Sequence, residues 1–125
     1  MYEIQELNLL STNNNGSTYE LAAIKSEGYL LATRSAGTTS GNHWHNGQPV
    51  AKNPESLLLI KGSVKLSLKH IKTEEQVQLK IVAPKMIKIM PQVLHKLEAI
   101  TDIIFLEFNS LEEHKADTFY PSKLI

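Results

Sequence analysis

Four side chains with metal-binding chemistry stand out in this 125-residue chain: His43, His45, Glu55 and His95. His43 and His45 are two residues apart, and on a β-strand residues i and i+2 point to the same face. Both imidazoles can therefore reach one point while Trp44 faces the other way. Glu55 follows after a loop, and His95 lies near the expected start of another strand, so all four side chains can converge.

This set of side chains suits one divalent transition metal ion. Three imidazoles and one carboxylate fit zinc, iron, manganese, nickel or copper, and they leave coordination positions for water or substrate. The chain has no cysteine, so nitrogen and oxygen must hold any metal. The alternative is a metal-free barrel in which the histidines do acid–base work or form hydrogen bonds in a cavity.

The segments around these residues have the pattern of short strands separated by turns. Ser63–Lys69 and Val77–Val82 alternate apolar and polar residues, which predicts a half-buried antiparallel hairpin. Two further hairpins are expected, from Tyr19–Ile24 with Gly28–Arg34 and from His95–Ile100 with Ile103–Asn109. Single strands are expected at Leu57–Ile60 and Met86–Met90, a polar loop at Ser11–Ser17, and a helix only at Leu111–Ala116. About nine strands predict an all-β sandwich or closed barrel that forms one domain over residues 1–125.

The motifs resemble those of the cupins. A glycine, His-x-His, a glutamate and a second glycine follow one another at Gly41, His43, His45, Glu55 and Gly62. The stretch from Ile89 to His95 resembles the second cupin motif, in which a proline turn precedes the third histidine. There are departures: nine residues separate His45 from Glu55, and Gln92 and Ala99 stand where the family has glycine and asparagine.

The resemblance implies a cupin double-stranded β-helix, or jelly-roll barrel, with His43, His45, Glu55 and His95 as the metal ligands. A narrower resemblance, at Lys69–Glu74 and Lys115–Tyr120, is to the C-terminal cupin half of capsular-polysaccharide reductase/epimerases and to deoxysugar epimerase and ketoisomerase cupins. It implies a metal-binding epimerase or isomerase of a sugar nucleotide in polysaccharide biosynthesis. Two alternatives remain: a non-catalytic barrel that binds a sugar or metabolite, and a small metal-dependent dioxygenase.

The amino-acid composition of the chain limits the classes of partner that it can bind. Thirteen basic and thirteen acidic side chains give no net charge, which argues against nucleic acid as a partner. No apolar stretch approaches ~18 residues, and the N-terminus lacks a signal-peptide pattern, so we expect a cytoplasmic protein without a membrane segment. A homodimer is expected, because small cupins commonly pair and because Trp44 and one face of Leu57–Ile60 are predicted to be exposed and apolar.

Other polar residues receive no role from the sequence, which does not identify a catalytic acid or base. His70 is expected in a solvated turn and His114 on a short polar helix. Three side chains are expected to be ordinary surface residues, with contact to a sugar nucleotide at the barrel mouth as the alternative: Tyr29, Arg34 and Lys52. On the last strand, the face that carries Phe105, Glu107 and Asn109 is expected to point to solvent, and the alternative is that it lines a polar cavity.

Overall fold

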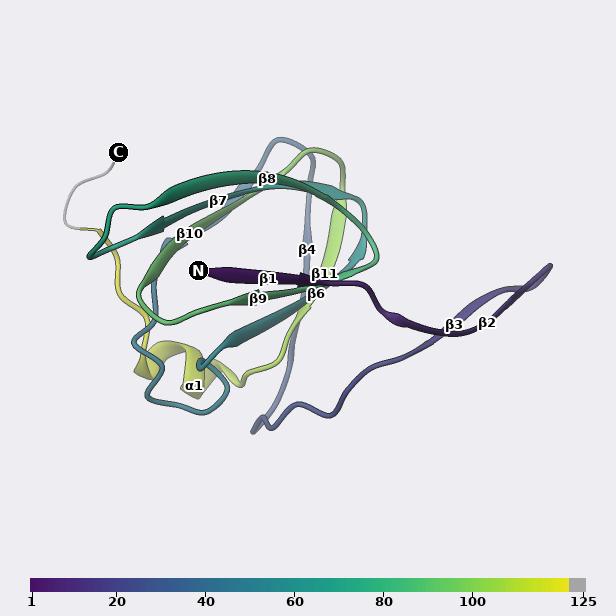
Figure 1. Ribbon diagram of the computed structural model, residues 1–125, viewed down its shortest axis with the longest axis horizontal. Coiled ribbons are helices and arrows are strands. Elements are labelled where there is room, and N and C mark those ends of the chain that lie inside the picture. Colours follow the sequence, from purple (N-terminus) through teal and green to yellow (C-terminus); the bar gives the residue numbers. More distant parts are fainter. Residues whose placement is uncertain (122–125) are drawn as a thin grey trace.

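The computed structural model describes residues 1–121, which form antiparallel strands and one short helix. The elements are β1 (Tyr2–Gln5), β2 (Asn8–Asn13), β3 (Gly16–Glu20), β4 (Leu30–Arg34), β5 (Thr39–His43), β6 (Glu55–Lys61), β7 (Ser63–His70), β8 (Gln76–Val82), β9 (Lys85–Ile89), β10 (Val93–Ala99), β11 (Ile103–Glu107) and α1 (Leu111–Ala116). One sheet has the order β1-β9-β6-β11-β4 and the other β5-β10-β7-β8. The two sheets enclose the centre of the molecule (Figure 1), and the predicted all-β jelly-roll fold is confirmed.

The core lies between the two sheets. On β7 the alternating residues Val64, Leu66 and Leu68 are buried, as their period of two predicts, and β7 pairs with β8 along its whole length. Residues from β6, β9, β10 and β11 complete the same apolar cluster. The predicted hairpin of Ser63–Lys69 with Val77–Val82 is therefore confirmed.

Gly62 makes the connection from β6 to β7 possible. Its φ is +92°, and a Cβ at this position would lie 2.3 Å from the carbonyl oxygen of Asp102. Only glycine accepts both the positive φ and this close approach. The second glycine of the cupin-like motif thus has a direct structural reason.

Two of the predicted strand pairings are wrong. Gly28–Arg34 does not pair with Tyr19–Ile24, because β4 instead forms an edge of the five-stranded sheet beside β11. The strands β10 and β11 lie in different sheets, so the turn at Thr101-Asp102 crosses from one sheet to the other and does not close a hairpin. Sequence alternation defines strands well but does not reveal which strands pair across a barrel.

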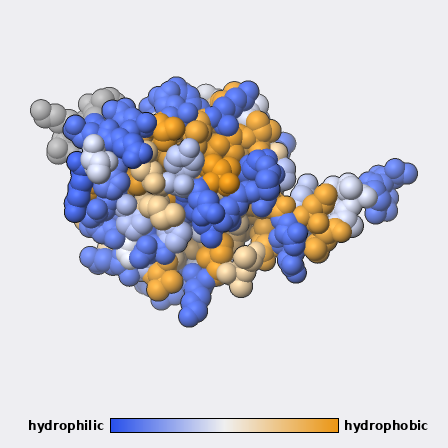
Figure 2. Space-filling view, in the orientation of Figure 1, coloured by the Kyte–Doolittle hydropathy of each residue, from blue (hydrophilic) through white to orange (hydrophobic). Residues whose placement is uncertain are grey.

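The segment predicted as a polar loop is a hairpin arm. The strands β2 and β3 pair with each other alone, and every residue in them is exposed. Figure 1 shows this arm extending away from the barrel, and Figure 2 shows apolar surface on it. Its exposed apolar residues are Leu9, Leu10 and Tyr19, with Leu21 just beyond.

The expected apolar outer face of Leu57–Ile60 is wrong, because Leu57–Leu59 are buried and only Ile60 is exposed.

The single helix, α1, lies where the sequence predicts it, at Leu111–Ala116. Ser110 caps it by accepting a hydrogen bond from the backbone N–H of Glu113, whose carboxylate accepts one from the N–H of Ser110 in return. No helix in residues 1–121 has the length and apolar character needed to cross a membrane.

Candidate metal centre

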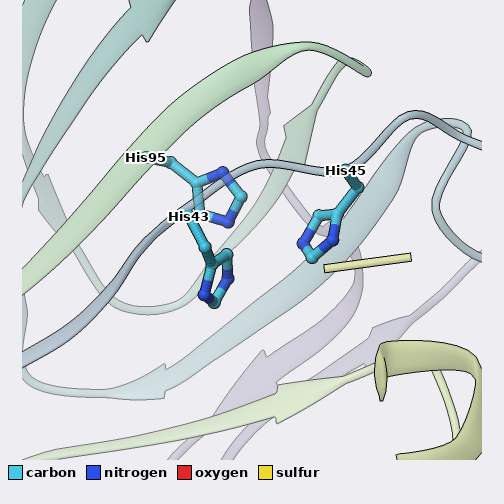
Figure 3. A group of neighbouring side chains, drawn as sticks. All are labelled: His43, His45 and His95. Carbon is cyan, nitrogen blue, oxygen red and sulfur yellow. The ribbon is translucent and has the colours of Figure 1, made fainter. Parts of the chain in front are cut away.

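Three strands bring the predicted ligands together inside the barrel. His43 ends β5, and it lies directly opposite His95 in the pairing of β5 with β10. Glu55 begins β6, in the facing sheet, and His45 follows β5 by two residues. One nitrogen from each of the three imidazoles lies within 4.8 Å of the others, and the three rings converge in Figure 3. The structure thus brings the three histidines together with Glu55 beside them, and their role as metal ligands stays a prediction.

His45 is fixed although it lies beyond the end of β5. Its Nδ1 is 2.8 Å from the backbone carbonyl oxygen of Asp117, and its own carbonyl oxygen accepts a hydrogen bond from the N–H of Gln92 at 2.7 Å. The carboxylate of Asp117 accepts hydrogen bonds from three consecutive backbone N–H groups, those of residues 46, 47 and 48. The buried Asp117 therefore ties the loop after His45 to the end of α1.

Glu55 occupies the centre of the group. Its Oε2 lies 3.0 Å from Nε2 of His45 and 3.1 Å from Nε2 of His95, and the whole side chain is buried. Its other oxygen, Oε1, lies 3.1 Å from Nζ of Lys52. The carboxylate thus uses one oxygen for a permanent ion pair and presents the other to two imidazoles.

The backbone determines which imidazole nitrogens carry protons. A carbonyl oxygen can only accept, so Nδ1 of His45 must donate to Asp117, and Nδ1 of His95 must donate to the carbonyl of Val93 at 3.0 Å. In the neutral form both rings then direct an Nε2 lone pair at the carboxylate oxygen of Glu55. Three lone pairs that converge in a buried space repel one another unless a cation lies between them.

Within residues 1–121, the only positive charge that could lie between these lone pairs is a proton on one of the two imidazoles or on the carboxylate. Nε2 of His45 and Oε2 of Glu55 are both buried, and neither has a hydrogen-bond partner within residues 1–121. A backbone carbonyl that holds Nδ1–H and leaves Nε2 free is the usual orientation of a metal-bound histidine. The imidazoles of His45 and His95, together with the carboxylate of Glu55, also match the ligand sets of several transition metals. The side chains present therefore fit a divalent metal ion.

The pKa directions reflect burial and the central carboxylate. Burial, with the charge of His95, lowers the pKa of His43 to about 3, so this ring is neutral at neutral pH. Burial alone would raise the pKa of Glu55, but the positive charge of His95, and the hydrogen bonds that His45 and His95 donate only when their Nε2 atoms are protonated, hold it well below its usual value. Burial also opposes protonation of His95, yet the charge of Glu55 outweighs it and raises the pKa of this ring. A proton shared by His95 and Glu55 is thus the alternative to a metal ion.

Two side chains that sequence reasoning placed outside the site belong to it. Lys52, predicted as a surface residue, is fully buried, and its Nζ contacts Glu55, Asn109 and His114. The His114 ring lies edge-on to His43, with ring centroids 5.3 Å apart. Burial, followed by the charge of Lys52, lowers the pKa of His114 to about 4.

The predicted solvent face of the last strand is wrong as well. Phe105 and Asn109 are buried, and Glu107 lines the barrel cavity together with His43, Glu55 and His95. Because β11 lies inside the five-stranded sheet, its inner face meets the opposite sheet and not water. Burial, with the charge of Glu55, raises the pKa of Glu107.

The remaining predicted side chains lie outside this group. His70 is the last residue of β7, and its Nδ1 accepts hydrogen bonds from the N–H groups of Lys72 and Thr73 in the turn that follows. Trp44 faces away from the imidazoles, as expected, and stacks on Phe119. Tyr29 and Arg34 are exposed, so of the three expected surface residues only Lys52 was misplaced.

A jelly-roll barrel with this His-x-His, glutamate and histidine set is a cupin. The chain belongs to the polysaccharide biosynthesis C-terminal domain family, whose sequence profile it matches over residues 11–119. A sequence comparison with curated proteins finds no match.

Solved structures share the fold at low sequence identity. QdtA, a sugar 3,4-ketoisomerase from Thermoanaerobacterium thermosaccharolyticum in complex with TDP, is 17% identical with a TM-score of 0.75, over 97% of this chain and 88% of that one. RmlC, a dTDP-6-deoxy-D-glucose-3,5-epimerase from Legionella pneumophila in complex with dTDP-4-keto-L-rhamnose, is 13% identical with a TM-score of 0.72, over 98% and 73%. The capsular polysaccharide assembling protein CapF from Staphylococcus aureus is 19% identical with a TM-score of 0.62, and the match covers 92% of this chain but only 34% of CapF.

Proposed function

We propose that this protein is a metal-binding cupin that epimerises or isomerises a keto sugar nucleotide. The observation that carries the metal site is the convergence of two Nε2 lone pairs on the buried Oε2 of Glu55. The substrate class is supported by family membership and by the ketoisomerase and epimerase structures that share the fold. His43, His45, Glu55 and His95 would hold one divalent transition metal ion, with zinc, iron, manganese and nickel as the candidates.

The chemistry required is proton movement at a carbon next to a carbonyl group. A bound dication would supply Lewis acidity that polarises the carbonyl oxygen of the sugar. The barrel cavity, which His43, Glu55 and His95 line, would hold the sugar beside the imidazoles. The titratable side chain that lines this cavity beyond the four proposed ligands is Glu107; burial, with the charge of Glu55, raises its pKa, and its carboxylate could accept the proton.

Metal content tests the site directly. Protein purified without an affinity tag or chelator should carry close to one equivalent of a transition metal, or take up one after dialysis. Replacing a ligand by His95→Gln should weaken metal binding at least about 10-fold, since even the loss of a residue behind a ligand costs that much. The matched control, His70→Gln, removes a half-buried imidazole at the end of β7, outside the metal site, and should leave metal binding unchanged. Protein that neither carries nor takes up any of the candidate metals would contradict the proposal.

Solvent exchange separates an enzyme from a binding barrel. An epimerase or isomerase should move deuterium from D2O into TDP-4-keto-6-deoxyglucose, the ligand seen in a QdtA variant. The position labelled would distinguish 3,4-isomerisation from 3,5-epimerisation. A protein that binds this compound without exchanging any proton would be a non-catalytic sugar-nucleotide module.

A further inference from the structure

The short helix α1 brings a fourth imidazole to the site. His114 lies with its ring centroid 5.3 Å from that of His43 and 5.6 Å from that of His45. The helix is held in place by its capping box and by the Glu113 carboxylate, which also accepts a hydrogen bond from the N–H of Glu27. The position of the His114 ring is therefore set by the fold and does not depend on a bound ligand.

Lys52 determines which nitrogen of the His114 imidazole carries the proton. Its fully buried Nζ lies 3.1 Å from Glu55 Oε1, 3.0 Å from Asn109 Oδ1 and 3.1 Å from His114 Nδ1. A lysine ammonium group has three N–H donors and no acceptor, so these three partners use its whole capacity. Nδ1 of His114 must accept, and a ring with a lone pair on Nδ1 carries its proton on Nε2.

The Nε2–H group of His114 makes no hydrogen bond within residues 1–121, although the side chain is only half-buried beside the other imidazoles. We propose that Lys52 holds His114 as the Nε2–H tautomer, and that this N–H donates to an oxygen atom of the ligand bound next to His43 and His45. A neutral, preset donor beside a carbonyl group stabilises the negative charge that develops on its oxygen when a neighbouring carbon loses a proton.

This inference rests on the proposed function for the identity of the ligand, a keto sugar, but not for the tautomer. Lys52 is a positioning residue in this arrangement, because it acts through His114 and Glu55. The loop between His45 and Glu55, which is longer than in the cupin pattern, thus has a function: it carries this buried ammonium group to the site.

The tautomer can be measured without any ligand. In ¹⁵N-labelled, chelator-treated protein at neutral pH, two-bond ¹⁵N–¹H correlations should show His114 with a protonated Nε2 and an unprotonated Nδ1. In Lys52→Met the preset form should be lost and both tautomers should be populated, while the His70 signals should not change. An Nδ1–H tautomer or an imidazolium form in the parent protein would overturn the proposal.

Activity tests the donor. His114→Phe keeps a ring without an N–H and should lower kcat/KM for deuterium exchange into TDP-4-keto-6-deoxyglucose about 10²–10³-fold, as expected for one lost donor to an oxyanion. His114→Gln keeps an oxygen for Lys52 and an N–H for the ligand, and it should recover at least about 10-fold of this loss. His70→Phe should match the parent.

If His114→Phe exchanges deuterium as fast as the parent, the ligand does not use His114 and the proposal is wrong. If the parent itself exchanges none, the proposed function fails, and the tautomer measurement alone then decides this inference. His114→Gln retains both polar contacts and keeps the activity test available if the phenylalanine variant does not fold.

Discussion

Glu55 has two roles that oppose each other in the absence of metal. Its carboxylate pairs with the buried ammonium of Lys52 and at the same time faces two imidazole lone pairs. In Glu55→Gln the ammonium keeps an acceptor oxygen but loses its counter-charge in a buried position. Such a change costs about 3–5 kcal/mol of unfolding free energy when it leaves a charge uncompensated.

We therefore predict that Glu55→Gln lowers both stability and metal affinity, the latter at least about 10-fold. Denaturant unfolding and metal titration measure the two effects. Glu98→Gln is the control, because the ion pair of Glu98 with Lys65 is long, at 3.8 Å, and exposed. It should change stability by less than about 1 kcal/mol. Unchanged metal affinity in folded Glu55→Gln would show that the site is three histidines alone.

The buried imidazole of His43 predicts a pH dependence of the metal-free protein. Its pKa is about 3 in the folded protein and 6.5 for the ordinary group, so between these values the unfolded chain binds a proton that the folded protein does not. The stability contributed by the neutral ring is complete above pH 6.5 and is lost as the pH falls towards 3. The charged or titratable groups around His43 include His95, Glu55, His45 and His114, and the Tyr120 ring lies edge-on to it with ring centroids 5.8 Å apart.

Urea unfolding of chelator-treated protein should therefore show stability falling between pH 6.5 and 4, by up to about 1.4 kcal/mol per pH unit from this group. His114 adds to the loss, since its pKa is about 4. His43→Gln does not titrate and should show a shallower slope over the same range. A slope equal to that of the parent would mean that His43 is not a buried neutral ring.

At the scale of elements, Asp117 joins α1 to the loop that follows β5. Three backbone N–H groups donate to its carboxylate, at 3.1, 2.7 and 3.1 Å, while its backbone carbonyl orients His45. Hydrogen bonds to a buried charged group contribute more than neutral ones. Asp117→Asn should therefore lower the unfolding free energy by about 2 kcal/mol or more and should weaken metal binding about 10-fold through His45.

Asp102→Asn is the matched control for this prediction. Its carboxylate is exposed and accepts a hydrogen bond from one backbone N–H, that of Ala36. The variant should change stability by less than about 1 kcal/mol and leave metal affinity unaltered. Equal metal affinity in Asp117→Asn and the parent would show that the loop does not position His45.

The sequence predicts the strands and the four central side chains because both depend on short-range patterns. The loop between His45 and Glu55 is longer than in the cupin pattern. It changes neither the i, i+2 spacing of His43 and His45 nor the spacing from Glu55 to Gly62. Lys52 and His114 escape prediction for a physical reason: the loop and α1 meet only through contacts between residues far apart in the chain, such as Lys52 with Asn109. Periodicity carries no information about such contacts.

The hairpin arm raises the question of how the whole molecule is assembled. An isolated two-stranded hairpin is marginally stable in water at best. All the residues of β2 and β3 are exposed, and Leu9, Leu10 and Tyr19 present apolar surface on it. Several strand edges in the barrel are also open, including those of β1 and β8. Exposed edges and apolar arms are both features that a second copy of the chain would cover.

We predict a homodimer in which the arm of each copy packs on the other. Light scattering at micromolar concentration should give twice the chain mass of 14.0 kDa. Replacing two exposed apolar residues together, Leu9→Ser with Leu10→Ser, should shift the protein towards the monomer without unfolding the barrel, because neither side chain contributes to the apolar core. Ile100→Ser, which removes another exposed apolar side chain that is not part of the arm, should leave the dimer intact. A parent protein that scatters as a single chain would refute this assembly, and a dimer that survives the arm variant would place its interface on another face of the barrel.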